Sequence, residues 1–413
     1  MSTGAVLQLA AYGTQDLFLT GNPQITHFKA VIKRHTNFAM ELSENYFDGK
    51  VAPGHKVSCK VERIGDLIHD VYLKLELPEI QALDGEDNVY TSWVNAIGYM
   101  IINRVEIQIG NRIIDRHYGQ WMNIWSELST NVSKKDVLNE MVGKKNFFTS
   151  TSQNGPLELY VPLQFWFCND LGSALPLVAI QRQDIFINIE FNPFEMLWTS
   201  NIDSVACNII DDDIEFNSAT LLINYIFLDE DERRYFAQNK HYYLIEQLQI
   251  ISESIDDSKD ENIFDMSSFN HPVKELIWTI QGVNVKLARQ WDNYSGKIIT
   301  LDEPIPEPPM IDAIIRFEGV ERFERRNERY FRLVVPYKYH TYTPVDNFIY
   351  IYSFATKPEI LQPTGTANFS RIDNPTLHIR GDQSLGKADI NIYARNYNIL
   401  RIIDGITGIL FAN

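Results

Sequence analysis

One stretch near the C-terminus has the spacing of a phosphate-binding loop. Residues Gly381 to Lys387 match the pattern G-x-x-x-x-G-K, in which a glycine-rich loop surrounds phosphate oxygens with backbone amides. The next residue is Ala388, where such a site needs the hydroxyl group of Ser or Thr to hold magnesium. The alternation of Ala388, Ile390 and Ile392 also predicts a strand after the loop, whereas a phosphate-binding loop is followed by a helix. We therefore interpret the segment as a turn between strands.

Other sequence patterns that carry chemistry are missing. The sequence has no H-E-x-x-H, no G-x-S-x-G and no G-x-G-x-x-G. Its nine histidines have no zinc-type spacing with one another or with cysteine. The sequence therefore predicts no catalytic, cofactor-binding or metal-binding residue, and a protein that is not an enzyme.

Two charged stretches and three glycosylation sequons have simple surface interpretations. Asp211 to Asp213 with Glu215 could offer oxygen ligands to a hard cation, but without an EF-hand pattern a solvated interdomain loop is favoured. Residues 321–329 (ERFERRNER) mix charges of both signs, which favours an exposed strand or loop with local ion pairs over a nucleic-acid patch. The N-x-S/T sequons begin at Asn131, Asn293 and Asn368. Without a signal peptide, we expect these sequons to be chance occurrences.

The composition indicates a large folded chain in a reducing compartment. Of the 413 residues, 45% are hydrophobic and 22% are charged, near the globular average, and the length favours two or three domains. Cys59, Cys168 and Cys207 are far apart and form no C-x-x-C, so no disulfide framework is expected. Residues 1–11 lack positive charge and no apolar run approaches about 18 residues, so we expect neither a signal peptide nor a membrane span. The net charge of −17 disfavours binding to phosphate backbones.

The elements that must position these residues are mostly strands. Apolar and polar residues alternate along many short segments, which is typical of half-buried strands. These segments are residues 73–77, 105–109, 157–161, 185–191, 221–227, 276–280, 348–354 and 390–392. Many short strands between turn residues favour a sandwich or barrel over a βαβ fold.

Helical patterns are few. Trp121, Trp125 and Leu128 share one face of a predicted helix over residues 121–128. Residues 133–142 resemble a capping box, beginning at Ser133, that is followed by apolar helix positions. Residues 229–234 place acidic side chains ahead of two arginines, as the dipole of a third helix favours. We interpret these helices as caps on a sandwich.

The two halves of the chain resemble each other. The matching pairs are residues 187–189 and 390–392 (both INI), residues 105–110 and 314–319 (VEIQIG and IIRFEG), and residues 161–162 and 335–336 (both VP). Together these matches predict two similar all-β domains that arose by duplication. We expect the join near Asp211 to Asp213, ahead of the strand that contains Leu221.

Several longer strings resemble one protein family. The strings at the start of the chain are residues 7–9 (LQL), 12–13 (YG), 15–16 (QD), 19–26 (LTGNPQIT), 28–29 (FK) and 34–39 (RHTNFA). This start is similar to the start of the major capsid proteins of nucleocytoplasmic large DNA viruses. Later strings with the same resemblance are residues 162–168 (PLQFWFC), 231–234 (DERR), 271–278 (HPVKELIW), 352–355 (YSFA), 362–365 (QPTG) and 368–373 (NFSRID). The resemblance spans nearly the whole chain in order.

This resemblance implies an all-β fold of two tandem eight-stranded jelly rolls, a double jelly roll, with a few short capping helices in loops. Residues 1–24 are expected to form an N-terminal arm, residues 25–215 the first jelly roll and residues 216–413 the second. Members of the family form homotrimers with a pseudo-hexagonal outline. Many such capsomers tile an icosahedral shell around an inner membrane and the genome.

The implied function is that of a major capsid protein, a structural subunit of the virion that assembles in the host cytoplasm. The implied partners are further copies of the chain, minor capsid and penton proteins, and the inner membrane indirectly, without direct contact to nucleic acid. One alternative is a double jelly-roll scaffolding protein of virion assembly, which would be scarce in purified virions. Another is a glycan-binding jelly-roll module with Trp and Tyr as sugar platforms. Most aromatic residues fall at alternating strand positions, however, which favours core packing.

Overall fold

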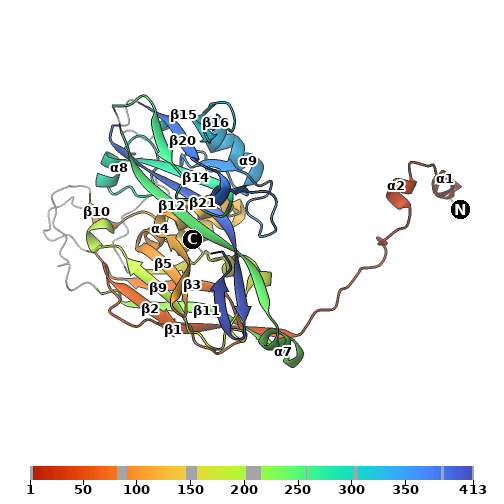
Figure 1. Ribbon diagram of the computed structural model, residues 1–413. Helices are drawn as coiled ribbons and strands as arrows, with labels where there is room; N and C mark the ends of the chain where they lie inside the picture. The colour runs from red at the N-terminus through yellow and green to blue at the C-terminus, as the bar shows by residue number, and fades with distance from the viewer. Residues whose placement is uncertain are drawn as a thin grey trace. The chain divides into compact units, whose positions relative to one another are not determined.

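The computed structural model describes residues 3–80, 91–145, 156–200, 215–256, 258–300, 306–382 and 386–411. The chain forms two compact units, Met1–Asn37 and Phe38–Asn413. The first unit, which we call the arm, contains helices α1 (Thr3–Ala10) and α2 (Leu17–Thr20) (Figure 1). None of its described residues is buried. The arm is therefore longer than the expected segment of residues 1–24. The second unit, which we call the body, contains the strands.

The first half of the body is a sandwich of two antiparallel sheets. Their strands pair in the orders β1-β11-β3-β7 and β2-β9-β5-β6. The eight strands are β1 (Phe38–Tyr46), β2 (Lys56–Lys60), β3 (Leu67–Leu77), β5 (Ile102–Ile109), β6 (Arg112–Tyr118), β7 (Leu157–Pro162), β9 (Ile185–Phe191) and β11 (Ser218–Leu228). The short strand β8 (Leu175–Pro176) extends the first sheet, and β4 (Thr91–Trp93) pairs with β10 (Trp198–Ser200).

The second half is a sandwich with the same strand order. Its sheets follow the orders β12-β21-β14-β18 and β13-β20-β15-β16. The eight strands are β12 (His241–Ile255), β13 (Asn262–Asp265), β14 (Pro272–Gly282), β15 (Met310–Phe317), β16 (Val320–Glu321), β18 (Tyr350–Ser353), β20 (Thr376–Gly381) and β21 (Ala388–Ile403). Short strands β17 (Arg326–Asn327), β19 (Ala367–Asn368) and β22 (Ile406–Ile409) pair at the margins. Within the described residues, two sandwiches of eight main strands each confirm the predicted double jelly roll.

The strand order tests each of the three internal matches. Strand β15 holds the place in the second sandwich that β5 holds in the first, so the match of residues 105–110 with 314–319 joins equivalent strands. The other two matches are wrong. Residues 187–189 lie in β9, whose counterpart is β20, whereas residues 390–392 lie in β21. Residues 161–162 end β7, whereas residues 335–336 begin helix α9 (Val335–Tyr339). Two- and three-residue strings are too short to identify equivalent strands.

The boundary between the sandwiches lies later than the sequence suggested. Strand β11 pairs with β1 and β3, so it belongs to the first sandwich, although we expected the second to begin at residue 216. The expected join at residues 211–213 lies outside the described residues. Helix α7 (Glu230–Gln238) follows β11 and precedes β12, so the sandwiches divide after Leu228.

The predicted alternation of apolar residues produces the cores. In β3, Leu73, Leu75 and Leu77 are fully buried, while Lys74 and Glu76 between them are half-buried. Strand β14 departs from alternation, because all of its residues after Pro272 are buried. The π-helical segment η4 (Tyr330–Val334) covers part of β14. The centre of its Phe331 ring lies 5.2 Å from the centre of the Trp278 ring.

The three predicted helices are present, with differences in detail. Helix α4 (Gly119–Ser129) contains the predicted apolar face, but it is buried almost throughout instead of lying as an outer cap. Helix α5 (Val132–Met141) is capped by Asn131, which accepts a bond from the backbone N–H of Ser133, so the predicted cap at Ser133 is wrong. Helix α7 begins with its predicted acidic turn. The remaining short helices are α3 (Ile97–Met100), α6 (Trp166–Asn169), α8 (Val283–Leu287), η1 (Leu171–Ser173), η2 (Phe194–Met196) and η5 (Phe369–Arg371).

Candidate functional site: the seam between the sandwiches

The two sandwiches meet along a polar seam, which we define as the contacts between residues 38–228 and residues 241–411. Strand β12 of the second sandwich lies against β6 of the first. The side chain of Gln247 donates to the carbonyl oxygen of Ile114 at 2.5 Å, and the backbone N–H of Leu248 donates to Asp115 Oδ1 at 3.2 Å. These bonds join the edges of two separate sheets, and so fix the sandwiches in register.

Loops add further bonds at other points of the seam. The guanidinium of Arg289 donates to the Trp198 carbonyl oxygen at 2.7 Å and stacks over the Trp198 ring at 4.2 Å. Asn95 donates to Asp292 Oδ2 at 2.7 Å. Far along the chain, the backbone N–H of Thr407 donates to Gln183 Oε1 at 2.6 Å. Contacts distributed in this way oppose relative motion of the two domains.

A buried charge network lies beside the seam. Arg395 of β21 donates to Glu275 Oε1 at 2.6 Å and to Glu246 Oε2 at 2.5 Å. Lys274 forms an ion pair with the same Glu246. The side chains of Lys274 and Glu275 are completely buried, and that of Arg395 is 6% exposed. The Arg395 guanidinium also stacks on Trp125 of α4, which belongs to the first sandwich.

Histidine completes the network. His340 Nε2 lies 3.1 Å from Glu275 Oε2, and its Nδ1 lies 3.1 Å from Glu359 Oε1. The six side chains thus carry three negative charges and, with a protonated imidazole, three positive charges. A buried charge is costly unless it is paired, so this balance is what allows the group to lie inside the protein.

The pKa values of the network follow from its geometry. Burial disfavours the charged form of His340, but Glu275 and Glu359 outweigh burial and raise the His340 pKa to about 8. Burial also opposes ionisation of Glu275, yet His340 and Arg395 lower the Glu275 pKa to about 2. Burial and the neighbouring Arg395 lower the pKa of Lys274 to about 8. The network is therefore charged and balanced at neutral pH.

A second buried carboxylate, that of Glu127, lies on α4 itself. Glu127 accepts bonds from Lys135 Nζ at 2.6 Å and from Lys144 Nζ at 2.7 Å. Burial opposes ionisation of Glu127, but the two lysines outweigh it and lower the pKa of this carboxyl. The ion pairs of Glu127 thus connect α4 to α5 and to the turn after α5. The stacking of Trp125 on Arg395 connects α4 to the second sandwich.

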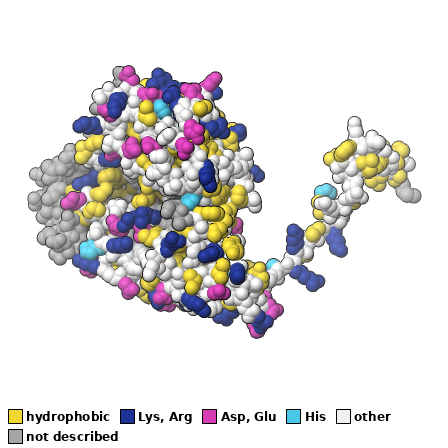
Figure 2. All heavy atoms as spheres, in the orientation of Figure 1, with side chains coloured by type: hydrophobic (Ala, Val, Ile, Leu, Met, Phe, Trp, Pro, Cys, Tyr) yellow, Lys and Arg dark blue, Asp and Glu magenta, His cyan; other side chains and the backbone are white. Residues whose placement is uncertain are grey.

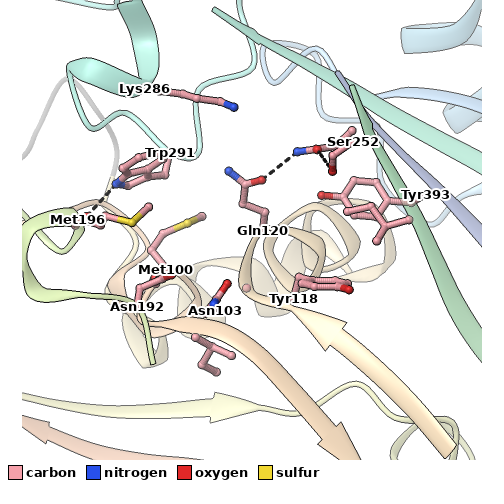
Figure 3. Close-up of a pocket in the computed structure, with 14 residues that line it drawn as sticks. Met100, Asn103, Tyr118, Gln120, Asn192, Met196, Ser252, Lys286, Trp291 and Tyr393 are labelled. Atoms are coloured by element: carbon pink, nitrogen blue, oxygen red, sulfur yellow. Dashed lines mark hydrogen bonds between the residues drawn. The ribbon is translucent and has the colours of Figure 1, made fainter. Parts of the chain in front are cut away.

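A cavity of about 400 Å3 opens in the seam (Figure 3). Its walls come from both sandwiches, and they include Gln120 of the first sandwich and Lys286 and Asn391 of the second. Asn391 donates to Gln120 Oε1 at 3.1 Å, so one bond beside the cavity joins the two sandwiches. Lys286 donates to Asp389 Oδ2 at 2.6 Å, which ties α8 to β21. Bonds around the cavity therefore hold its walls together.

The structure also locates the residues that the sequence singled out. Gly381 ends β20 and Ala388 begins β21, which confirms that a strand follows the loop, and residues 383–385 lie outside the described part of the chain. Asp211 to Asp213 also lie outside it, and Glu215 pairs with Lys50 at 3.5 Å.

Residues 321–329 form ion pairs, of which some are local as predicted and others reach carboxylates outside the stretch. Arg325 donates to Asp312 Oδ1 at 2.9 Å and also pairs with Glu261. Arg326 lies 3.5 Å from Glu324. Both arginines are thus engaged with carboxylates of the same sandwich.

The cysteines and sequons lie in different surroundings. Cys59 is buried and Cys168 half-buried, and both are free thiols, while Cys207 lies outside the described residues. Burial raises the pKa of the Cys59 thiol to about 12, which suppresses its reactivity. Asn131 and Asn368 are exposed, whereas Asn293 is 6% exposed and donates to the Lys297 carbonyl oxygen at 2.9 Å.

Tryptophan is used for packing. The five buried indoles are those of Trp93, Trp121, Trp125, Trp166 and Trp278. Trp198 and Trp291 are half-buried, and both carry seam contacts. The five buried tryptophans agree with the core-packing interpretation.

The described ranges contain neither a candidate metal cluster nor a candidate membrane-spanning helix. Within these ranges, no three or more His, Cys, Asp or Glu side chains are grouped so that they could hold a metal ion. Nor does this part of the chain contain a helix with the length and apolar character needed to cross a bilayer.

Sequence reasoning missed the charge network beside the seam. It did not identify the buried charges of Glu246, Lys274, Glu275 and Arg395, although they interrupt strand segments that are otherwise mostly apolar or uncharged. The available signal was the pair Lys274 and Glu275 in the string HPVKELIW. A strand whose neighbouring residues are apolar on both faces is buried, so charged residues within it are buried too.

Comparisons with known proteins extend over both sandwiches. Residues 26–229 match the family described as "Major capsid protein N-terminus", and residues 232–408 match "Large eukaryotic DNA virus major capsid protein". The chain is 38% identical over 438 residues to the major capsid protein of Pyramimonas orientalis virus, which covers 99% of this chain and 100% of that protein. It is 36% identical over 521 residues to the major capsid protein of Phaeocystis pouchetii virus, with the same coverage. Its fold is similar to a chain in a quasi-atomic model of the PBCV-1 virus capsid, with a TM-score of 0.79, 29% identity, and coverage of 94% of this chain and 100% of that chain.

Proposed function

The chain belongs to the family of large eukaryotic DNA virus major capsid proteins, and from this premise we propose how its two sandwiches build the icosahedral capsid. Each sandwich acts as one stiff wedge of a capsomer. Three chains associate in a closed ring, so six wedges of two alternating kinds fill a site of hexagonal outline with threefold symmetry. Such an obligate ring would bury several thousand Å2, that is, more than about 2,000 Å2.

The observation that carries this proposal is the seam. Two sandwiches of identical strand order serve as equivalent wedges only when their relative orientation is fixed. The bonds from Gln247 and Leu248 to the first sandwich, and the stacking of Arg395 on Trp125, support such a fixed orientation. In this role the chain is a structural protein and not an enzyme.

The test is the mass and outline of the purified protein. The chain has a mass of 47.8 kDa, so light scattering of a trimer should give three times this value. Electron microscopy of the same sample should show particles with six lobes. A monomeric or dimeric mass, or trimers with three separate lobes and open gaps, would contradict the proposal.

The proposal includes partners beyond the trimer. Capsomers contact neighbouring capsomers, minor capsid proteins and penton proteins, and assembly takes place in the host cytoplasm. The arm joins capsomers from beneath. The net charge of −17 supports a shell that does not bind nucleic acid directly. Quantitative proteomics of purified virions separates this role from that of a scaffold, because a scaffolding protein would be scarce there.

A further inference from the structure

The arm is an apolar and basic segment that buries none of its described residues. Phe18 is 93% exposed, Phe28 is 98% exposed and Leu9 is 83% exposed. Large exposed apolar groups of this kind mark interaction sites. Residues 1–15 contain no charged residue, and residues 29–34 carry three basic side chains and no acidic one. Figure 2 shows the apolar side chains at the N-terminal end of the arm and the basic ones in the stretch before β1.

The arm and the body carry opposite charge. Residues 1–37 contain three basic residues and one acidic residue. The remaining chain therefore has 34 basic and 53 acidic residues, a net charge of −19. Attraction between these charges favours contact of an arm with the acidic surface of a body.

The body has an apolar strip to receive such an arm. Phe38, Met40 and Leu42 alternate along β1, so they share one face of that strand. Their exposed fractions are 51%, 42% and 55%. Asn45, on the opposite face, is buried and accepts a bond from Tyr225, so the strip points away from the sandwich core. In the described part of the chain β1 is the last strand of its sheet.

Acidic residues lie beside this strip. Phe38 pairs with Leu228 at the end of β11, two residues before α7 begins. The first turn of α7 contains Glu230, Asp231 and Glu232. The side chains of Glu230 and Asp231 are 86% and 98% exposed, and their partner Arg234 offsets only part of their charge. The body thus presents an apolar strip next to acidic side chains. The arm carries apolar side chains and, nearer to β1, basic ones.

We propose that the arm of one copy of the chain docks along the outer face of β1 and the first turn of α7 of a second copy. The apolar residues of the arm contact Phe38, Met40 and Leu42, and Lys29, Lys33 and Arg34 lie near the acidic turn. This inference rests on the proposed capsid function and specifies the surface through which the arm joins copies.

The length of the arm suits contact with another copy. The stretch 21–37, between α2 and β1, contains no helix or strand. Fully extended, such a stretch spans up to about 55 Å. A compact domain of the size of the body has a radius of gyration of about 21 Å. The extended stretch is therefore long enough for the arm to reach a neighbouring copy.

A membrane is the less favoured partner. Three basic side chains supply about 1 kcal/mol each at an anionic lipid surface. The body, with a net charge of −19, would be repelled from the same surface and equally from the body of a second copy. A second copy, unlike a membrane, offers an apolar strip at a fixed position beside an acidic turn, which matches the apolar and basic groups of the arm.

Complementary variants can test whether the contact is between copies. The first variant, Glu230→Gln, Asp231→Asn and Glu232→Gln, keeps the arm lysines but lacks the acidic turn. The second, Lys29→Arg and Lys33→Arg, keeps the arm charge but lacks amines that a carbodiimide can couple to carboxylates. Both full-length chains are co-expressed with different tags, assembled, treated with carbodiimide and analysed by mass spectrometry of arm peptides joined to residues 230–232.

The expected result is an arm-to-α7 cross-link in the wild type and in the mixture, but in neither variant alone. Adding Leu42→Lys to the second chain should lower the yield in the mixture at least about fivefold, which corresponds to roughly 1 kcal/mol. Val320→Lys, at a site that is 70% exposed on the second sandwich, should leave the yield unchanged.

Three outcomes would overturn the proposal. A cross-link in the wild type but not in the mixture would mean that the arm folds onto its own subunit. No arm-to-α7 cross-link in the wild type would exclude the contact, and arm-dependent sedimentation with phosphatidylserine vesicles would then identify a membrane partner. An unchanged yield with Leu42→Lys would exclude the β1 strip. None of these results bears on the trimer mass and outline that test the proposed function.

Discussion

The guanidinium of Arg395 lies 3.6 Å from the centre of the Trp125 ring, and these two residues belong to different sandwiches. A desolvated cation–π contact of this kind stabilises by about 2 kcal/mol. Because the same guanidinium also holds Glu246 and Glu275, the contact ties the first sandwich to the charge network of the second. This arginine therefore contributes to fixing the orientation of the two sandwiches.

Replacing this arginine should weaken the whole body. Arg395→Met leaves Glu246 and Glu275 without their shared partner, and an uncompensated buried charge costs about 3–5 kcal/mol. The measurement is the free energy of unfolding in urea, with trimer content followed by light scattering. Arg401→Met, on the exposed part of the same strand, is the matched control and should change stability by less than about 0.5 kcal/mol. Equal effects of the two substitutions would refute the role of the network.

Stability should depend on pH through His340. Its pKa is raised from 6.5 to about 8 in the folded protein, so the folded protein binds this proton more tightly than the unfolded chain does. The resulting stabilisation, about 2 kcal/mol, is complete below pH 6.5 and is lost as the pH rises through about 8. The stability difference between wild type and His340→Gln should therefore shrink by this amount between about pH 6 and pH 9. A difference that stays constant over this range would contradict the assignment.

A single methyl group should disrupt the start of α4. A Cβ added to Gly119 would overlap the carbonyl oxygens of Tyr99 and Ile102, which are backbone atoms that cannot turn aside. Gly119→Ala should therefore destabilise the body by about 3 kcal/mol or more. The control is Gly408→Ala in β22, where nothing lies within 4 Å of the added carbon. Thermal denaturation of both variants measures the difference, and similar midpoints would show that α4 packs less tightly than described.

The sequons should differ in accessibility. Asn293 is buried and bonds to Lys297 and Gln290 through its amide, so the folded protein cannot carry a glycan there. Peptide mass mapping of protein from virions should find Asn293 unmodified. A glycan on Asn293 would require a different conformation of this loop, whereas the exposed Asn131 and Asn368 place no such restriction.

Removal of the segment 1–23 should separate trimer formation from shell assembly. This segment contributes no buried side chain in its described part, so trimers should form with unchanged subunit number. Assembly into shells should fail or slow. Electron microscopy of the products together with light scattering checks both parts, and loss of trimers would refute an assembly role for the arm.

Much of the fold could be predicted from the sequence because strand alternation is a local property. Leu73, Leu75 and Leu77 identify β3 without knowledge of any partner strand. The residues of β11 alone do not show that it belongs to the first sandwich, because this depends on its pairing with β1 at the start of the body. Nothing in the segment 218–228 distinguishes a last strand of one sandwich from a first strand of the next.

The seam could not be predicted for a related reason. Arg395 and Trp125 are far apart in the sequence, and each looks ordinary in its own segment. A charged residue in an apolar strand can be judged only once its partners are known, because burial and pairing are properties of the assembled sandwiches.

The pairing of β1 with β11 also determines the order in which the protein can be made. All eight main strands of the first sandwich exist once residue 228 has been synthesised, before any strand of the second has emerged. At about 5–20 residues per second, the stretch from 229 to 413 takes roughly 10–40 s, whereas β-sandwiches fold in milliseconds to seconds. The nascent chain can thus complete the first jelly roll on the ribosome. The strands of the second jelly roll emerge too late to pair in place of the equivalent strands of the first.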